Sequence, residues 1–178
     1  ARGRSIFQTV AECSKPVIVG VSGFALGAGF ELALAADIIV ASESAEFGLP
    51  EVTLGIIPGG GGSQRLTRIV GKQKAMELVL TGRRIDAREA EALGIVNTVV
   101  GKRENWREKT LEIAAVIARR PPVAVRLAKQ AVNAALEDGL TGGIAHERRL
   151  FELAMATEDR VEGMTAFIEK RRPDFKGR

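Results

Sequence analysis

The sequence predicts an α/β protein whose core of short strands and helices is followed by an all-helical region. Two β-branched runs bounded by Pro or Gly, residues 16–22 and 37–41, are typical of strands buried on both faces. A short Leu- and Ala-rich helix, residues 30–36, lies between them, and this alternation favours layered α/β structure. After residue 102 the strand patterns stop, and four amphipathic helices follow one another.

The other elements of the core follow in order along the chain. Gly23 to Gly29 is expected to form a glycine-rich turn, and residues 45–47 a short third strand. Residues 50–62, rich in Pro and Gly, predict a shaped loop that ends where Ser63 can cap a helix. The remaining expected elements are helices 63–70, 72–80 and 86–93 (the last capped by Asp86) and strands 84–85 and 95–100. Residues 1–102 are therefore interpreted as an α/β core.

The second half of the chain, residues 103–178, predicts helices only. The four helices are expected at residues 104–119, 121–137, 141–156 and 159–170, the second opened by Pro121-Pro122. Their apolar faces are more extensive than the small core ahead of them could cover.

Composition excludes several classes of protein. The chain has 178 residues, 46% apolar and 27% charged, which is typical of a folded globular domain and not of disordered or fibrous chains. One cysteine, Cys13, excludes an internal disulfide framework, and with one histidine, His146, most transition-metal sites lack ligands. We therefore expect no metal site, and chemistry built on carboxylates and backbone groups.

The net charge of +4 is concentrated at the C-terminal end. Residues 170–178 hold five of the 26 Lys and Arg and one of the 22 Asp and Glu, which leaves 21 of each sign elsewhere. This segment is either a solvated tail or a docking point for phosphates. Because the rest of the chain is balanced in charge, and the whole chain has no Tyr, one Trp and seven Phe, the sequence disfavours nucleic acid as a partner.

No signal peptide or membrane span is expected. The long apolar stretch at residues 17–36 contains Glu31 and four glycines, and these residues argue against a membrane-spanning helix. The chain opens without Met, in a helix-like stretch, so it is expected to be part of a longer protein.

Two carboxylates stand out as candidates for chemistry. Glu31 is the only charged residue between Lys15 and Asp37, and burying its charge is costly unless it is paired or protonated. Its side chain either pairs with a distant cation, or is exposed to solvent at the edge of the helix, or serves proton transfer near neutral pH. Glu51 is a second carboxylate in apolar company, and paired carboxylates in different environments are a common acid/base device.

Glycines accompany both carboxylates. Leu26-Gly27-Ala28-Gly29 leads into the helix that carries Glu31, so its N–H groups could face an anion or a developing oxyanion, although glycines also serve close packing. Gly59 to Gly62 follow Glu51, and four successive glycines favour a loop whose backbone lines a ligand site over a merely flexible turn.

The segment from Val21 to Arg68 carries G-x-A-L-G-A-G-x-E-L-A-L-A-A-D, F-G-x-P-E and G-I-I-P-G-G-G-G-S-Q-R-L. Further on follow L-T-G-R-x-I-D-A-x-E-A and E-D-R-x-E-G-M-T-A-F-x-E-K-R. In these motifs the chain resembles the enoyl-CoA hydratase (crotonase) family, with the closest likeness to short-chain enoyl-CoA hydratases. The resemblance implies a crotonase-like ββα spiral that is incomplete at its N-terminus, followed by C-terminal helices that form a trimer, with hexamers possible.

The resemblance also implies roles for individual residues. Glu31 and Glu51 match the two catalytic glutamates, which hold the attacking water and transfer the proton. The N–H of Ala28 matches one of two oxyanion donors, and Gly59 matches a glycine that helps to position water. Phe167 and Lys170 match residues that reach the coenzyme A bound by a neighbouring subunit. In the family the second oxyanion donor lies in β/α units that precede the match to Pro16, and this sequence does not contain these units.

The implied activity is the reversible addition of water to an enoyl-CoA thioester. Coenzyme A is then part of the substrate, and no other cofactor is expected. The alternatives are an enoyl-CoA isomerase or a specialised dehydratase of the same family, and a non-catalytic RNA-binding or structural relative. The expected location is the cytoplasm in a prokaryote, or the mitochondrion in a eukaryote.

Overall fold

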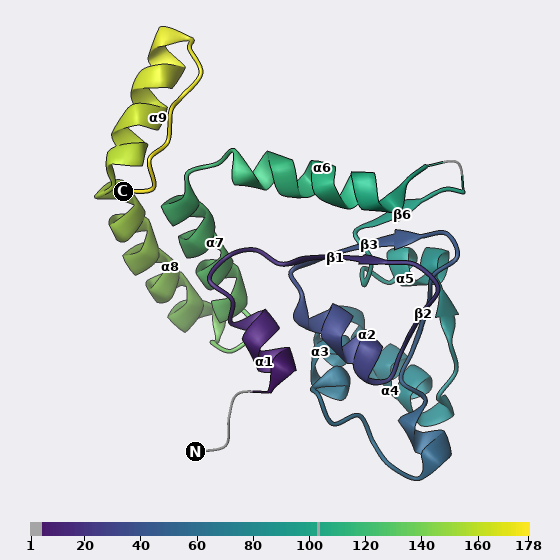
Figure 1. Cartoon of the computed structure of the whole chain (residues 1–178). Helices are drawn as coiled ribbons and strands as arrows, with labels where there is room; N and C mark the ends of the chain where they lie inside the picture. The colour runs from purple at the N-terminus through teal and green to yellow at the C-terminus, as the bar shows by residue number, and fades with distance from the viewer. Residues whose placement is uncertain (1–4, 103) are drawn as a thin grey trace. The chain divides into compact units, whose positions relative to one another are not determined.

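The computed structural model describes residues 5–102 and 104–178 (Figure 1). Two compact units emerge: the sheet unit comprises residues up to Cys13 and Val17–Glu112, and the helical unit comprises Ser14–Pro16 and Ile113–Arg178. The division falls inside helix α6 (Trp106–Ala118), whereas the pattern of the sequence changes at residue 102, ahead of that helix. Residue 103, the first of the expected second region, lies outside the described residues.

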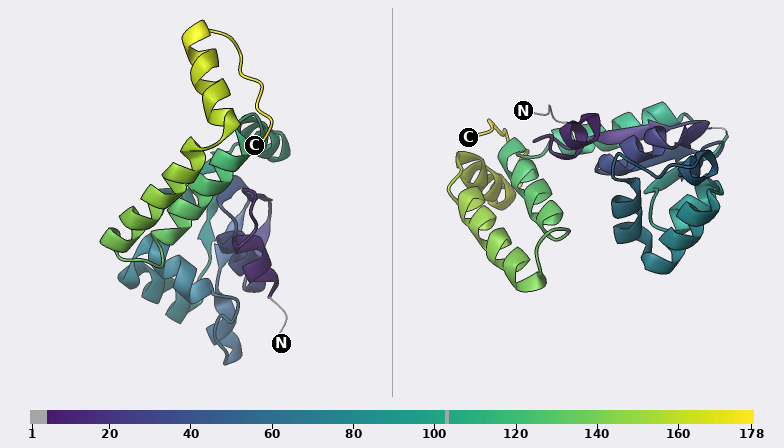
Figure 2. Two further views of the ribbon diagram at one scale, coloured as in Figure 1. Left: turned by 90° about the vertical axis from the view of Figure 1, so that its left-hand side faces the viewer. Right: turned by 90° about the horizontal axis from the view of Figure 1, so that it is seen from below.

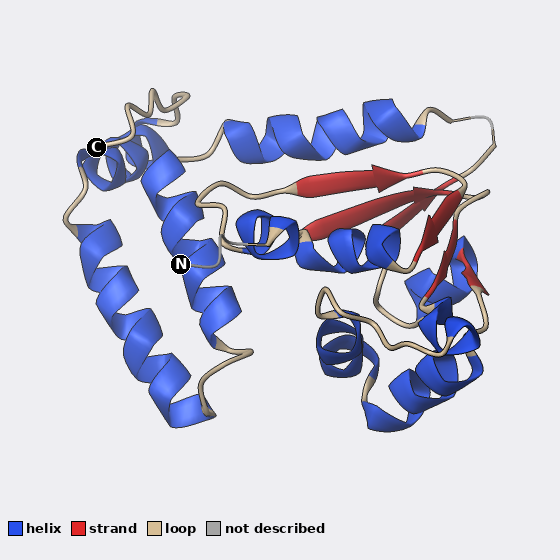
Figure 3. Ribbon diagram, turned by 60° about the horizontal axis from the view of Figure 1, so that its bottom comes forward, coloured by secondary structure: helices blue, strands red, loops and turns tan. Residues whose placement is uncertain are grey.

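The sheet unit holds two small sheets, drawn as red arrows in Figure 3. One has the order β1 (Ile18–Val21), β3 (Ile38–Ser42), β6 (Thr98–Val100), and all its strands are parallel. The other has the order β2 (Phe24–Leu26), β4 (Glu46–Gly48), β5 (Ile85–Asp86), with only β5 antiparallel. Each consecutive strand pair adds one strand to each sheet, and α2 follows the first pair, as a ββα spiral requires.

The helices of this unit join and cover the strands. They are α1 (Ile6–Ala11), α2 (Ala28–Ala35), α3 (Gly62–Val70), α4 (Lys72–Thr81), α5 (Ala87–Ala92) and the 3₁₀ helix η1 (Pro50–Leu54). The Asp86 cap of α5 is confirmed, since Asp86 Oδ1 accepts a hydrogen bond from the Glu89 N–H at 2.8 Å.

The glycine-rich segment after β1 differs from its prediction as a single turn. Gly23 (φ 73°) and Gly27 (φ 52°) turn the chain, but the three residues between them are extended and pair with β4 as strand β2. The flanking strand β1 is also less buried than predicted, because Val21 alone among its residues is fully buried.

Three further boundaries differ from the sequence prediction. The expected loop 50–62 begins with η1, and Gly61 (φ 101°) takes the capping position of α3, so Ser63 lies inside the helix and not at its cap. Only glycine adopts this φ without strain, so Gly61 allows the chain to leave the loop and enter the helix at this residue. Strand β6 begins at Thr98, because Ile95 and Val96 are buried in the core without entering the ladder.

The core of the sheet unit fixes the helix and the loop that carry the two glutamates. Phe30 of α2 and Phe47 of β4 are 1% and 0% exposed, and their ring centroids lie 5.3 Å apart. Leu49, just ahead of η1, and Leu66 of α3 are buried in the same core. The starts of α2, η1 and α3 are therefore anchored on one cluster.

The helical unit contains the end of α6 and three further helices, α7 (Pro122–Ala134), α8 (Leu140–Met155) and α9 (Glu158–Glu169). Helices α7 and α8 pack against each other along their lengths (Figure 2). Across the described residues, no helix is both long and apolar enough to cross a membrane.

Candidate active site

Helix α2 begins where the chain turns sharply out of β2. Gly27, at φ 52°, donates its N–H to the Gly48 carbonyl at 2.9 Å, which ties the turn to β4. Ala28 is then the first helical residue and is exposed, so its N–H is among those that a helix leaves without an internal partner. An exposed N–H at a helix start favours negative charge, as an oxyanion donor requires.

Glu31 lies in the first turn of α2 and is 3% exposed. Its Oε1 accepts two backbone hydrogen bonds, from Gly60 N–H at 2.7 Å and from Gly62 N–H at 2.8 Å. Within the described chain Glu31 makes no ion pair, and its burial excludes exposure to solvent, so both structural interpretations of this residue are wrong. Two amides and the start of a helix stabilise its charge instead.

The glycine loop that binds Glu31 is itself fixed from two sides. Arg65 of α3 donates from Nη1 to the Gly60 carbonyl at 2.8 Å, and Phe7 of α1 packs against Gly60. Methyl groups could not be added without displacing Glu31: one on Gly60 would come within 2.7 Å of Oε2, and one on Gly62 within 3.0 Å of Oε1. The glycines are required for this close approach of backbone to carboxylate.

Glu51 is the second residue of η1, and its carboxylate lies against the turn that starts α2. A side-chain atom on Gly27 would lie 3.3 Å from Glu51 Oε1. The other oxygen, Oε2, is buried and has no hydrogen-bond partner in the part of the chain that is described. A buried carboxylate oxygen without a partner is costly, and such groups concentrate where substrate or water binds.

The C-terminal end of helix α4 packs against η1. Gly82 ends α4 at φ 64°, and a side chain there would come within 3.3 Å of Pro50 Cα. The next residue, Arg83, forms ion pairs with Glu77 of α4 and, at 2.6 Å, with Glu89 of α5. Hydrogen bonds from Arg83 lower the pKa of the Glu77 carboxyl to about 2 and also lower the pKa of Glu89. This pairing ties the end of α4 to α5.

The remaining predicted residues take different positions. Gly59 is an exposed loop residue next to Gly60, so the structure brings it to the loop whose Gly60 N–H binds Glu31. Phe167 and Lys170 end α9 in the helical unit, where Phe167 is 85% exposed and Lys170 adopts a left-handed conformation at φ 55°.

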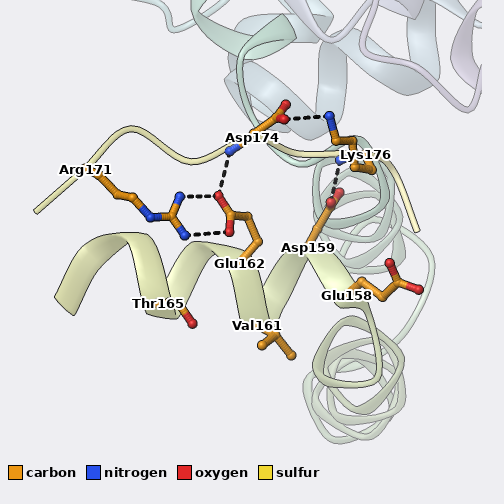
Figure 4. A pocket seen from close by; sticks show the side chains of 8 residues that line it. All are labelled: Glu158, Asp159, Val161, Glu162, Thr165, Arg171, Asp174 and Lys176. Carbon is orange, nitrogen blue, oxygen red and sulfur yellow. Dashed lines mark hydrogen bonds and ion pairs between the residues drawn. The ribbon is translucent and has the colours of Figure 1, made fainter. Parts of the chain in front are cut away.

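The basic C-terminal segment is largely exposed, and ion pairs and hydrogen bonds tie it to α9. Arg171 makes two hydrogen bonds to Glu162 of α9, at 2.6 and 2.8 Å, and Arg178 pairs with Glu158 at 2.9 Å. The segment after α9, residues 171–178, therefore lies back along the helix as a strap (Figure 4). The groove between helix and strap is lined by Glu158, Asp159, Val161, Glu162, Thr165, Arg171, Asp174 and Lys176.

Sequence reasoning missed Arg65 and Phe7, which contact the loop around Glu31, and it did not identify Glu31 as the partner of the Gly60 and Gly62 amides. The run of glycines signalled a backbone-lined site, but its closest ligand is the protein's own Glu31. Among the residues described, no three His, Cys, Asp or Glu side chains gather as a metal site would need.

Comparison with known families decides what this arrangement belongs to. The profile of the family described as Enoyl-CoA hydratase/isomerase matches residues 2–178, nearly the whole chain. The chain is a member of the enoyl-CoA hydratase/isomerase family. The resemblance found in the motifs is thereby confirmed.

Individual relatives are similar over almost all of this chain. A probable enoyl-CoA hydratase of Rhizobium meliloti is 55% identical, covering 97% of this chain and 66% of that protein. A 2,3-dehydroadipyl-CoA hydratase of Escherichia coli is 52% identical (93% and 64% covered), and a mitochondrial enoyl-CoA hydratase of Pongo abelii is 48% identical (94% and 57%).

A solved structure confirms the crotonase fold. The crystal structure of an enoyl-CoA hydratase from Bacillus anthracis is 47% identical and superposes with a TM-score of 0.93 over 97% of this chain and 66% of that one. The chain thus spans about two-thirds or less of the length of the relatives it matches.

Proposed function

We propose that the protein is an enoyl-CoA hydratase, which adds water across the α,β-double bond of an enoyl-CoA thioester. The observation that carries the proposal is the pair of glutamates at the start of α2. Glu31 is fixed by two amides, and Glu51 offers a buried oxygen that has no partner among the described residues. Hydratase names among relatives 48–55% identical to this chain support it.

The chemistry follows from which oxygen atoms are free. Oε1 of Glu31 already accepts two hydrogen bonds, so Oε2 is left to orient the attacking water. The water oxygen bonds to the β-carbon as the water gives up a proton to one glutamate, and a proton reaches the α-carbon from the glutamates, with the Glu51 carboxylate as the second proton-transfer group. The Ala28 N–H stabilises the negative charge that develops on the thioester oxygen.

Substrate binding and assembly are further parts of the proposal. Phe167 and Lys170 would contact the coenzyme A of a neighbouring subunit in a trimer, and Gly59 would help to position water. Because Arg171 and Arg178 are paired with α9, the strap offers fewer free cations to RNA than its composition suggests, which disfavours an RNA-binding relative. The cytoplasm or, as for the Pongo abelii relative, the mitochondrion is the proposed location.

The test is the loss of ultraviolet absorbance when the whole protein meets crotonyl-CoA, with 2,3-dehydroadipyl-CoA as a second substrate. Glu51→Gln is expected to lower kcat by about 10²–10⁴-fold or more, because it removes the proton-transfer group. Binding of 3-hydroxybutyryl-CoA should persist in this variant. The exposed Glu43→Gln variant, with the same change in charge, should match the wild type.

Two results would contradict the proposal. Wild-type turnover in Glu51→Gln would remove Glu51 from the reaction. A product without a new hydroxyl group, made from a 3-enoyl thioester, would instead identify the protein as an isomerase.

A further inference from the structure

Helix α1 places one aromatic side chain beside the carboxylate of Glu31. We propose that Phe7 is a positioning residue for Glu31: its ring closes the space beside Gly60 and keeps the carboxylate in the orientation that water addition requires. This inference rests on the proposed hydratase function for its effect on catalysis, while its structural part is tested separately.

The geometry around Gly60 carries the proposal. A methyl group on Gly60 would come within 2.5 Å of Phe7 Cε2, 2.7 Å of Phe7 Cζ and 2.7 Å of Glu31 Oε2. The ring and the oxygen therefore face the same small space at the Gly60 Cα. The ring is half-buried, and α1 packs against α2, the helix that carries Glu31.

The chemistry of the contact suits a carboxylate. Cε2 and Cζ are adjacent atoms of the ring edge, and the edge of an aromatic ring carries partial positive charge. This edge faces the Gly60 Cα, so Phe7 closes the space beside the carboxylate without donating a hydrogen bond that would compete with the reacting water. The ring also fills space that water would otherwise enter, and such water would compete for the Gly60 and Gly62 amides.

Phe7 and Arg65 act on the same loop from different sides. Arg65 holds the Gly60 carbonyl at 2.8 Å, and Phe7 packs against the Gly60 Cα. Both contacts fix the residue whose N–H binds Glu31 Oε1. Loss of the ring therefore loosens the carboxylate without removing any group that binds coenzyme A.

The expected result for Phe7→Ala in the whole protein is a fall in kcat of about 10- to 100-fold, because a displaced catalytic group loses alignment. KM for crotonyl-CoA should stay within about twofold, since the interactions that bind the substrate and the transition state equally are unchanged. Phe7→Leu, which keeps an apolar side chain of similar reach, should recover most of kcat. Ile6→Ala, an apolar truncation at a 62% exposed position of the same helix, is the matched control.

A second measurement needs no turnover. Hydrogen exchange at the Gly60 and Gly62 amides should be slow in the wild type and in Ile6→Ala, and faster in Phe7→Ala. Unchanged protection in a folded Phe7→Ala protein would overturn the proposal, and so would lost protection with wild-type kcat. If the wild type does not hydrate enoyl-CoA at all, faster exchange still supports the positioning role while the proposed function fails.

Discussion

Glu31 shows how a charged side chain can be buried without a cation beside it. Its carboxylate takes amide hydrogen bonds of 2.7 and 2.8 Å and lies in the first turn of α2, where the helix dipole favours negative charge. Charge-assisted bonds of this kind offset part of the cost of desolvation. The same bonds fix the orientation of the side chain, so one arrangement serves both stability and chemistry.

Gly62→Ala tests this fit directly. The added methyl group would lie 3.0 Å from Glu31 Cγ, Glu31 Oε1 and Leu49 Cδ2, so the carboxylate or the core must shift. We expect a loss of about 1–3 kcal/mol in the free energy of unfolding, measured by urea denaturation, together with a lower kcat. Gly143→Ala, also a helical glycine but with open space around it, should gain up to about 1 kcal/mol. Equal stability of the two variants would contradict the contact.

The glutamates could be predicted from the sequence, but their partners could not. Glu31 and Glu51 were conspicuous because each is a charge in an apolar stretch. Gly60 and Gly62 lie 29 and 31 residues from Glu31, and only the fold brings them together. The role of Phe7 could not be predicted, because a phenylalanine in a short helix is typical of packing and the sequence does not show that Gly60 lies beside it.

The helices and strands also differ in how well the sequence predicts them. Helices α7 to α9 were predicted well because each shows a long amphipathic pattern. Strand β2 was missed because it has three residues between two glycines, and only its pairing with β4 reveals it. The pairing of the strap with α9 is not predictable from composition, because its acidic partners lie on the preceding helix, such as Glu162 nine residues before Arg171.

Docking of the strap depends on pH through Glu162. The hydrogen bonds from Arg171 and from the Asp174 N–H lower the pKa of the Glu162 carboxyl from 4.5 to about 2. A lowered carboxyl pKa stabilises the docked strap above the unfolded value of 4.5, and that contribution is lost as pH falls through about 2. The strap is therefore expected to stay in place in mild acid.

The NMR shift of the Asp174 amide, which donates to Glu162 Oε1 at 2.8 Å, reports this titration. Its midpoint should lie near pH 2, and Glu162→Gln should abolish the transition. Glu152→Gln, which removes an exposed carboxylate of α8, serves as the control and should leave the midpoint unchanged. A midpoint near 4.5 in the wild type would show that the strap is not held by Glu162.

At the scale of the whole molecule, the charge and the apolar surface have different distributions. Of the five basic residues at residues 170–178, Arg171 and Arg178 pair with acidic side chains of α9. On α8, by contrast, Leu140, Ile144 and Phe151 are 82%, 58% and 54% exposed. Their spacing of four and seven residues places them on one stripe of the helix. Exposed apolar side chains that recur along one stripe of a helix, here with Glu147 and Arg148 between Ile144 and Phe151, are candidates for an interaction site.

The trimer proposed for this family member gives that stripe an occupant, another copy of the chain. Ile144→Asp is then expected to shift the sedimentation coefficient of the whole protein toward the monomer, because a charge in an apolar interface must be desolvated without a partner. Ala145→Asp adds the same charge to the next residue, which is exposed but points about 100° away from the stripe, and should leave assembly intact. Dissociation by both variants would indicate general instability of α8. An intact oligomer in both would place the interface elsewhere, and hydration by the dissociated variant would show that the site needs no neighbouring Phe167 or Lys170.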